Sequence, residues 1–188
     1  MAGSLWRGYL RLLETHPFKV QVATAGVLIG IGDCCSQQVV ERRGRKHNFR
    51  RTLGMMSIGV FIVGPAMRYW YIFLDRTIKG NRTIDAMKKV AMDQSIFAPC
   101  IIATFFTTTG LLFGKTRAEI KSKFHNQYLS TLLTNYYIWP FVQTVNFNFV
   151  PLQHRVFVVN FIAIFWNTYL SWAANKDEHD EELVKITD

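Results

Sequence analysis

Apolar runs that alternate with short, strongly basic connectors organise most of this 188-residue sequence. A helix of about 20 apolar residues is long enough to cross the hydrocarbon of a bilayer, and several of these runs have no charged face to show to water. We therefore predict an all-α integral membrane helical bundle rather than a water-soluble one. Transmembrane helices are expected at 18–40, 52–74, 92–113 and 128–150, and a fifth apolar helix at 156–174 either crosses the bilayer or lies partly in its interface.

The two ends of the chain differ from these runs. Residues 1–17 are short, basic and amphipathic, which is typical of a helix that lies at a membrane interface. Residues 176–188 form an acidic tail that we expect to be mobile, and we assign residues 1–175 to a single multi-pass membrane domain. The acidic residues of the tail are Asp177, Glu178, Asp180, Glu181, Glu182 and Asp188.

The net charge of +9 is carried mainly by the connectors, which places Lys and Arg beside the apolar runs. Lys and Arg flank transmembrane helices in this way, whereas a nucleic-acid-binding domain gathers them on one face. The lipid bilayer is therefore the expected partner, and no direct nucleic acid is expected. The connectors at 41–51 and 114–127 carry slightly more Lys and Arg than the other segments, so the positive-inside rule slightly favours placing these two inside.

Small and polar residues recur on one face of each apolar run. In the first run, Gly26 and Gly30 have a spacing that lets another helix approach closely, and Asp33 and Gln37 continue the same face. An ionised carboxylate such as Asp33 is costly in hydrocarbon unless it is paired or hydrated. The residues that we expect to line a pore or to make polar contacts between helices are Asp33, Gln37, Asp93, Asn135, Gln143, Asn146 and Asn167.

Prolines and one arginine add local constraints inside the apolar runs. A proline removes a helical hydrogen bond and kinks the helix, so it is also a candidate hinge for gating. Arg68 stands beside the aromatic cluster 69–71, which is typical of a membrane interface. We favour Arg68 as an anchor that snorkels to this interface over an inward-facing ion-pair partner of Asp33 or Asp93. The kinks are expected at Pro65, Pro99 and Pro140.

The polar faces allow more than one interpretation. They could line a shared water-filled passage, in which Asp33 and Asp93 attract cations and the amides replace hydration. They could instead hold the helices together in a dry core, through Asp–Arg or Asp–Asn pairs. The residues alone slightly favour packing. A third alternative is a carrier for a small metabolite such as a nucleotide precursor, although the sequence has no visible inverted repeat.

Motifs of enzymatic chemistry are absent from the sequence. It has no HExxH, no glycine-rich phosphate loop and no pair of carboxylates at a catalytic spacing. The five histidines are scattered through termini and connectors, and none of the three cysteines has the paired spacing of metal ligands. We therefore expect no enzyme activity, no catalytic residue, no metal site and no cofactor.

Short motifs also follow one another in a specific order along the chain. They are Gly32-Asp33 with Ser36-Gln37-Gln38, Gly64-Pro65 with Trp70-Tyr71, Asp93-Gln94 with Ala98-Pro99, Trp139-Pro140 with Gln143 and Asn146-Phe147, and Trp166-Asn167 with Tyr169-Leu170-Ser171. Through this set, residues 5–173 closely resemble the Mpv-seventeen/peroxisomal-membrane-protein family. Within that family the chain looks most like the founding mitochondrial inner-membrane member, through His16-Pro17, the segment 41–44 and the segment 134–137.

The resemblance implies a small multi-pass protein of the mitochondrial inner membrane, with the peroxisomal membrane as the alternative location. Family members are described as non-selective channels that modulate membrane potential. The founding member is tied to mitochondrial DNA maintenance and to control of reactive oxygen species. These implications shift our expectation from helix packing to a channel-like passage. Small ions or metabolites, and further copies of the chain in a homo-oligomer, are then the expected partners besides the bilayer.

Overall fold

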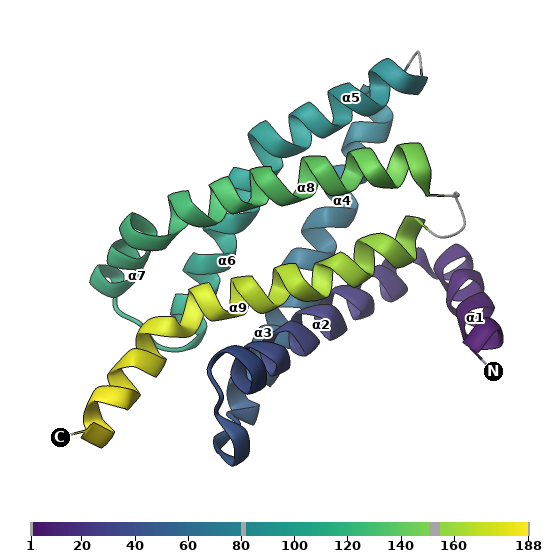
Figure 1. Cartoon of the computed structure of the whole chain (residues 1–188). Helices are drawn as coiled ribbons and strands as arrows, with labels where there is room; N and C mark the ends of the chain where they lie inside the picture. Colours follow the sequence, from purple (N-terminus) through teal and green to yellow (C-terminus); the bar gives the residue numbers. More distant parts are fainter. Residues whose placement is uncertain (1, 80–81, 151–154, 188) are drawn as a thin grey trace.

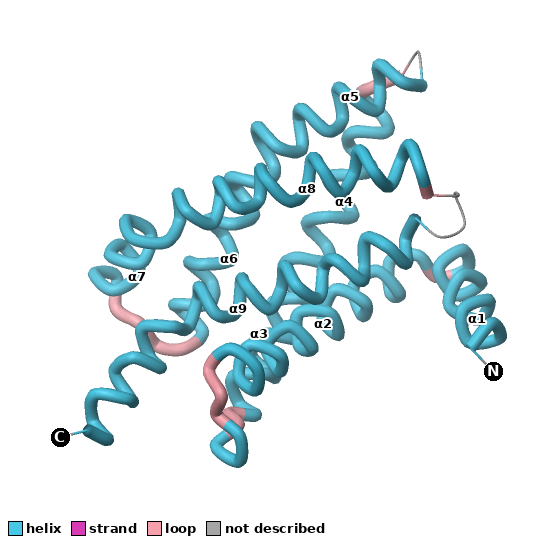
Figure 2. The backbone as a smooth tube through the Cα atoms, in the orientation of Figure 1, coloured by secondary structure: helices cyan, strands magenta, loops and turns pink. Residues whose placement is uncertain are grey.

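The structure is a computed structural model that describes residues 2–79, 82–150 and 155–187; within these it gives only the backbone of residues 2–5, 82–83, 86, 146–148, 155–157 and 177–187. Helices make up nearly all of this described part, and it contains no strand (Figure 1). The loops are short and lie at the ends of helices (Figure 2). The prediction of an all-α protein is confirmed.

Long helical rods lie across one another in the described chain, and most of them consist of α-helices that continue through a π-helical turn. A separate amphipathic helix, α1 (Ala2–Thr15), stands at the start of the first rod, and a short 3₁₀ turn, η2 (Gly44–Lys46), follows that rod. The rods are α2 (Pro17–Cys35) with η1 (Ser36–Val40), α3 (Phe49–Ile58) with η3 (Gly59–Val63) and α4 (Gly64–Thr77), α5 (Arg82–Met92) with η4 (Asp93–Phe97) and α6 (Ala98–Leu112), α7 (Arg117–Lys123) with η5 (Phe124–Tyr128) and α8 (Leu129–Phe149), and α9 (Arg155–Thr187).

Three stretches of the described chain are long and apolar enough to cross a membrane. They are Pro17–Val40, Phe49–Thr77 and Met87–Leu112, which coincide with the first three predicted spans. The fourth and fifth apolar runs form α8 and the first half of α9, which pack against each other. Their crossing of the bilayer stays a prediction. The chain is thus an all-α membrane protein with several apolar helices.

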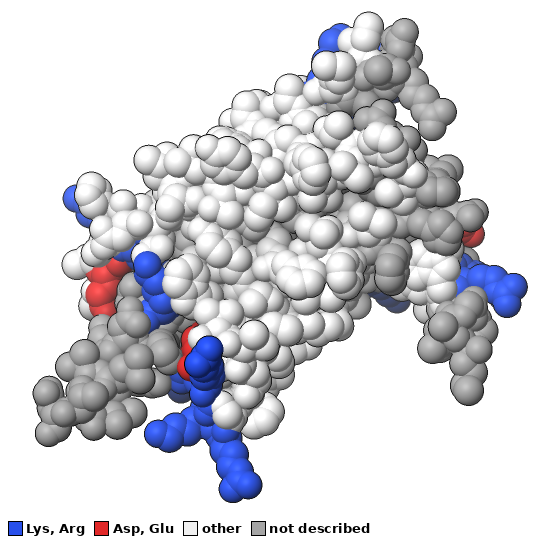
Figure 3. Space-filling view, in the orientation of Figure 1, with Lys and Arg blue, Asp and Glu red and all other residues white. Residues whose placement is uncertain are grey.

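The outer surface of the rods is apolar. Large side chains such as Phe61 and Phe141 are mostly exposed, and exposed apolar area on this scale marks a surface that meets lipid. Figure 3 shows one such face, white over its middle, with Lys and Arg side chains projecting at its margins. The interior holds a separate apolar core, which includes Met55, Ile58 and Phe106. Apolar residues therefore face both inward and outward, as expected for a bundle in a membrane.

Two predicted connectors and the tail are more helical than the sequence indicated. Nearly all of α5 lies in the stretch 75–91 between the second and third predicted spans, and α7 lies in the connector at 114–127, so each forms the beginning of a rod. Lys and Arg are good helix formers, and α7 begins with a capping box between Thr116 and Glu119. The expected tail continues α9 as helix as far as Thr187.

Glycines allow α2 to pack closely against helices on two sides. A Cβ atom built on Gly59 of η3 would lie 2.7 Å from the Cα atom of Gly26, and one built on Gly32 would lie 2.5 Å from Cβ of Asn167 in α9. No real Cβ atom tolerates such distances, so these positions require glycine. The close approach predicted for Gly26 and Gly30 is confirmed, and the helix that approaches belongs to the same chain.

Two of the three predicted kinks coincide with π-helical turns. Pro65 and Pro99 are each the second residue of the α-helix that follows a π turn, η3 and η4 respectively. A proline lacks the N–H group and its ring collides with the carbonyl four residues earlier. The wider π turn before the proline gives this ring room. Pro140 lies inside α8, which continues through it. A gating role for these prolines stays a prediction.

Candidate functional site

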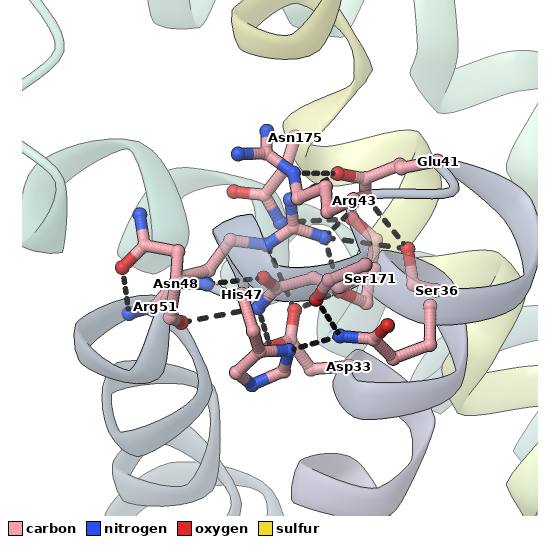
Figure 4. A network of polar contacts seen from close by, with 12 residues as sticks. Asp33, Ser36, Glu41, Arg43, His47, Asn48, Arg51, Ser171 and Asn175 are labelled. Atoms are coloured by element: carbon pink, nitrogen blue, oxygen red, sulfur yellow. Dashed lines mark hydrogen bonds and ion pairs between the residues drawn. The ribbon is translucent and has the colours of Figure 1, made fainter.

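The polar residues of the apolar runs fall into two separate regions. One is a buried ion cluster at the end of the bundle where α2 leads into α3 (Figure 4). The other is a cavity of about 340 Å³ lined by residues of α1, α2, η3, α4, η4, α6, α8 and α9. The side chain of Asn146 lies outside the described residues. Of the other predicted residues, Asp33 and Gln37 belong to the ion cluster, and the cavity is lined by Asp93, Asn135, Gln143 and Asn167.

The ion cluster is centred on Arg51, the third residue of α3. Its Nε atom donates to Oδ1 of Asp33 at 2.8 Å, and its Nη1 and Nη2 atoms donate to the two oxygens of Glu41 at 2.8 and 2.5 Å. Paired contacts between a guanidinium and a carboxylate are among the strongest hydrogen bonds in proteins. Only 2% of Arg51 and none of Asp33 is exposed. The ion pairs are therefore shielded from water.

Three neutral donors complete the hydrogen bonds of Asp33. The Ser171 hydroxyl donates to Oδ1 at 2.6 Å, while the Gln37 amide and the Thr52 hydroxyl donate to Oδ2 at 2.7 and 2.6 Å. These partners come from α9, η1 and α3, so the carboxylate ties the first rod to the second and the last. A carboxylate with this many donors has no need of a solute, and this region matches the packing interpretation.

Glu41 lies just beyond the first membrane-spanning segment and retains its charge in the cluster. Burial alone raises the pKa of its carboxyl. Hydrogen bonds from Arg51 and Arg43, the positive charge of Arg51 and a hydrogen bond from Ser36 outweigh burial and hold the pKa at about 2. Two carboxylates, Asp33 and Glu41, thus face two guanidinium groups, and the cluster has no excess charge.

The central role of Arg51 is not visible in the sequence, where Arg51 is one of several cations in the connector at 41–51. An ion pair between Asp33 and Arg68 is the less favoured alternative from the sequence, and in the structure Arg51 is the cation that contacts Asp33. One signal was available. A carboxylate in an apolar run needs a buried cation, and Arg51 stands at the very start of the following run. Glu41 and Ser171, the other partners of Arg51, carried no comparable signal.

A chain of hydrogen bonds crosses one wall of the cavity. Trp70 of α4 donates its indole N–H to Oδ1 of Asp93 at 3.0 Å, and the Gln94 amide donates to Oδ2 at 3.0 Å. Asn135 of α8 donates in turn to Oε1 of Gln94 at 2.8 Å. Asp93 and Gln94 belong to the π turn η4, whose widened backbone presents both side chains to the same cavity. These hydrogen bonds fix the Asp93 carboxylate in position, and in the described part of the protein none of its donors is a cation.

Arg68 lines the cavity from α4 and is half-buried. Its Nη1 atom donates to Oε1 of Gln21 on α2 at 3.0 Å. The alternatives considered from the sequence paired Arg68 with Asp33 or Asp93, or placed it at the interface with the aromatic cluster 69–71. Within the described residues it forms no ion pair with either acid. Arg68 therefore stands at the cavity wall as a cation held by a neutral amide.

Helices α8 and α9 present three further side-chain amides to the cavity. Within the described part of the chain, the side-chain amides of Gln143, Asn160 and Asn167 have no hydrogen-bond partner. Gln143 comes from α8, and the other two lie two helical turns apart on α9. Trp139 and Trp166 stand among them with their rings 6.3 Å apart. Polar groups that converge without partners in a largely apolar cavity are typical of a site for small solutes.

Comparison with known proteins supports one family. The sequence profile of the Mpv17 / PMP22 family matches residues 110–171. The chain is 52% identical to the mitochondrial inner membrane protein Mpv17 of Xenopus laevis over 177 residues, which is 94% of this chain and 99% of the relative. It is 49% identical to the human protein of the same name over 92% of this chain and 99% of the relative. It is also 41% identical to Protein sym-1 of Neurospora crassa over 87% of this chain and 95% of the relative. No solved structure matches the chain.

Proposed function

We propose, from the premise that the chain belongs to the Mpv17 / PMP22 family, that its central cavity is part of a channel-like passage for small ions and polar solutes. The chain is a multi-pass protein of the mitochondrial inner membrane. In that location a non-selective passage modulates the membrane potential. The family resemblance extends this proposal to mitochondrial DNA maintenance and to the homeostasis of reactive oxygen species.

The observation that carries the proposal is the set of polar groups around the cavity. A volume of about 340 Å³ exceeds the roughly 30 Å³ that one water molecule occupies, so several water molecules fit. Amides at the wall replace the hydration of a solute. Asp93 is the sole acid among the described lining residues. Asp33 does not line the cavity, and its charge is neutralised by Arg51 in the ion cluster. The negative charge that attracts cations is therefore assigned to Asp93 alone.

The prolines have a place in the same proposal. Gly64, directly before Pro65, and Ala98, directly before Pro99, line the cavity. Trp139, directly before Pro140, does so as well. A bend at any of the three prolines would change the width of the cavity. We propose that these helices act as the moving parts of a gate.

Conductance of the purified protein in planar lipid bilayers tests the passage. We expect stepwise currents, and we expect Asp93→Asn to reduce the preference for cations over anions. The matched control is Asp75→Asn, which removes an exposed carboxylate from the last turn of the neighbouring helix α4. Equal effects of both substitutions would assign the selectivity to surface charge. The absence of any current from a folded protein would reject the channel.

A carrier is the second candidate, and the charge pattern of the cavity favours it. The wall presents both a cation, Arg68, and an anion, Asp93, which suits specific binding of a small metabolite better than free passage of ions. Saturable uptake of one solute into proteoliposomes, without current steps, would identify a carrier. If the folded protein shows neither uptake nor current, a non-conducting structural role remains.

A further inference from the structure

Two opposite charges face the same cavity, and each is held by neutral groups. Asp93 accepts hydrogen bonds from Trp70 and Gln94, and Arg68 donates to Gln21. Among the described residues neither charge takes part in an ion pair. In the ion cluster, by contrast, both carboxylates contact Arg51 directly. The cavity wall thus differs in kind from the region of the bundle that serves packing alone.

Both charged groups retain hydrogen-bonding capacity. A guanidinium has five N–H donors, and the one hydrogen bond of Arg68 within the described chain uses Nη1. Each oxygen of the Asp93 carboxylate receives one donor, although it has two acceptor positions. A charge that lacks a counter-charge inside a membrane protein is costly and marks a functional site. The cavity therefore offers a strong anion-binding group and a strong cation-binding group together.

The two charged groups line one cavity. Arg68 and Tyr71, three residues apart on the same face of α4, line it together with Asp93 of η4. Gln143, Asn160 and Asn167 line the same cavity from α8 and α9, and their side-chain amides have no partner among the described residues. A solute that contacts both charges would also meet this amide wall.

We infer that the cavity binds a small zwitterionic solute of the amino-acid class, with its ammonium group at Asp93 and its carboxylate at Arg68. Such a solute satisfies both charges while it adds no net charge to the membrane interior. The amides of α8 and α9 then contact the remainder of the solute. This inference rests on the proposed function, because it names the solute class of the same cavity.

Tryptophan fluorescence of the full chain in lipid nanodiscs reports binding, because Trp139 and Trp166 line the cavity. The probes are glycine, 4-aminobutanoate and 6-aminohexanoate, which separate the two charges by increasing lengths. Each is compared with the amine and the carboxylate of the same chain length. Loss of one charged contact weakens binding by about 10- to 100-fold. We expect at least one zwitterion to bind more tightly than both of its singly charged analogues by this factor.

Charge-removing variants assign each end of the solute. Arg68→Gln should make the zwitterion and the matching amine bind equally, and Asp93→Asn should make the zwitterion and the matching carboxylate bind equally. Arg68→Lys should retain most of the preference. The controls are Arg76→Gln and Asp75→Asn, two exposed positions in the last turn of α4, which should leave binding unchanged. Thermal unfolding in the same nanodiscs confirms that each variant is folded.

The outcomes separate this inference from the proposed passage. If no zwitterion is preferred over its singly charged analogues while the bilayer currents are present, the solute class is wrong and the passage stands. If zwitterions bind with the expected preference and no current or uptake occurs, the binding site stands and the transport function fails. Equal loss of binding in the α4 surface controls would also overturn the inference, because the charges would then act from the surface.

Discussion

Substitution of Arg51 by leucine tests how dry the ion cluster is. The change removes the donors to Asp33 and Glu41 and leaves two buried carboxylates. Glu41 keeps its ion pair with Arg43 at 2.6 Å, so most of the penalty falls on Asp33. Removal of one partner from a buried ion pair costs about 3–5 kcal/mol. Because Asp33 keeps three neutral donors, we expect Arg51→Leu to lower the free energy of unfolding by about 3 kcal/mol, the lower end of that range.

The measurement is an unfolding titration with a denaturing detergent in mixed micelles, followed by tryptophan fluorescence. Arg50→Leu is the matched control, because Arg50 precedes Arg51 directly but is exposed. Its free energy of unfolding should stay within about 0.5 kcal/mol of the wild-type value. Arg51→Lys should fall between the two, since an ammonium keeps the charge but cannot contact both carboxylates in the planar geometry of a guanidinium.

Two results would refute this reasoning. One is an Arg51→Leu protein as stable as Arg50→Leu, which would mean that water reaches the carboxylates. The other comes from the double variant Arg51→Leu with Asp33→Asn. Because asparagine removes the unpaired charge, the double variant should regain part of the lost stability. If it is less stable than Arg51→Leu alone, the penalty does not come from an uncompensated charge at Asp33.

Two further predictions concern packing and pH. Gly59→Ala should lower the free energy of unfolding by about 1–3 kcal/mol, because its Cβ would lie 2.7 Å from the Cα atom of Gly26. The control is Gly8→Ala, which has open space around it and should leave the free energy of unfolding equal or raised. Similar losses for both variants would contradict the close packing of α2. The pKa of Glu41 is lowered from 4.5 to about 2, so its contribution of about 3 kcal/mol should be complete above pH 4.5 and be lost as the pH falls toward 2. Glu41→Gln should be less stable than the wild type at neutral pH, and a stability difference that stays constant down to pH 2 would exclude this linkage.

The apolar runs were sufficient to predict the helices and the class of the protein. A run of the length of Pro17–Val40 has one stable state in a membrane, because its backbone groups must be bonded within the helix. The close approach at Gly26 also followed from local spacing. These features depend on neighbours within one helix, which a single sequence displays directly.

The division of the polar residues into a cluster and a cavity could not be predicted in the same way. Asp33 and Asp93 look alike in the sequence, since each is an acid in an apolar run. Their environments differ because Arg51 reaches Asp33, whereas Asp93 meets Trp70 and Gln94. Which cation reaches which acid depends on how the rods pack and on where the π turns fall. Neither is encoded in the spacing within one helix.

The order of the cluster residues along the chain has a consequence for assembly in the membrane. Asp33 and Arg51 both belong to the first helical hairpin, so this ion pair can form without any later part of the chain. The hairpin thus brings its own counter-charge into the bilayer. Ser171, which donates to Asp33 from α9, joins only after the last apolar helix has been added. Asp33, which pairs with Arg51 inside the first hairpin, is therefore also the residue that the last helix contacts through Ser171.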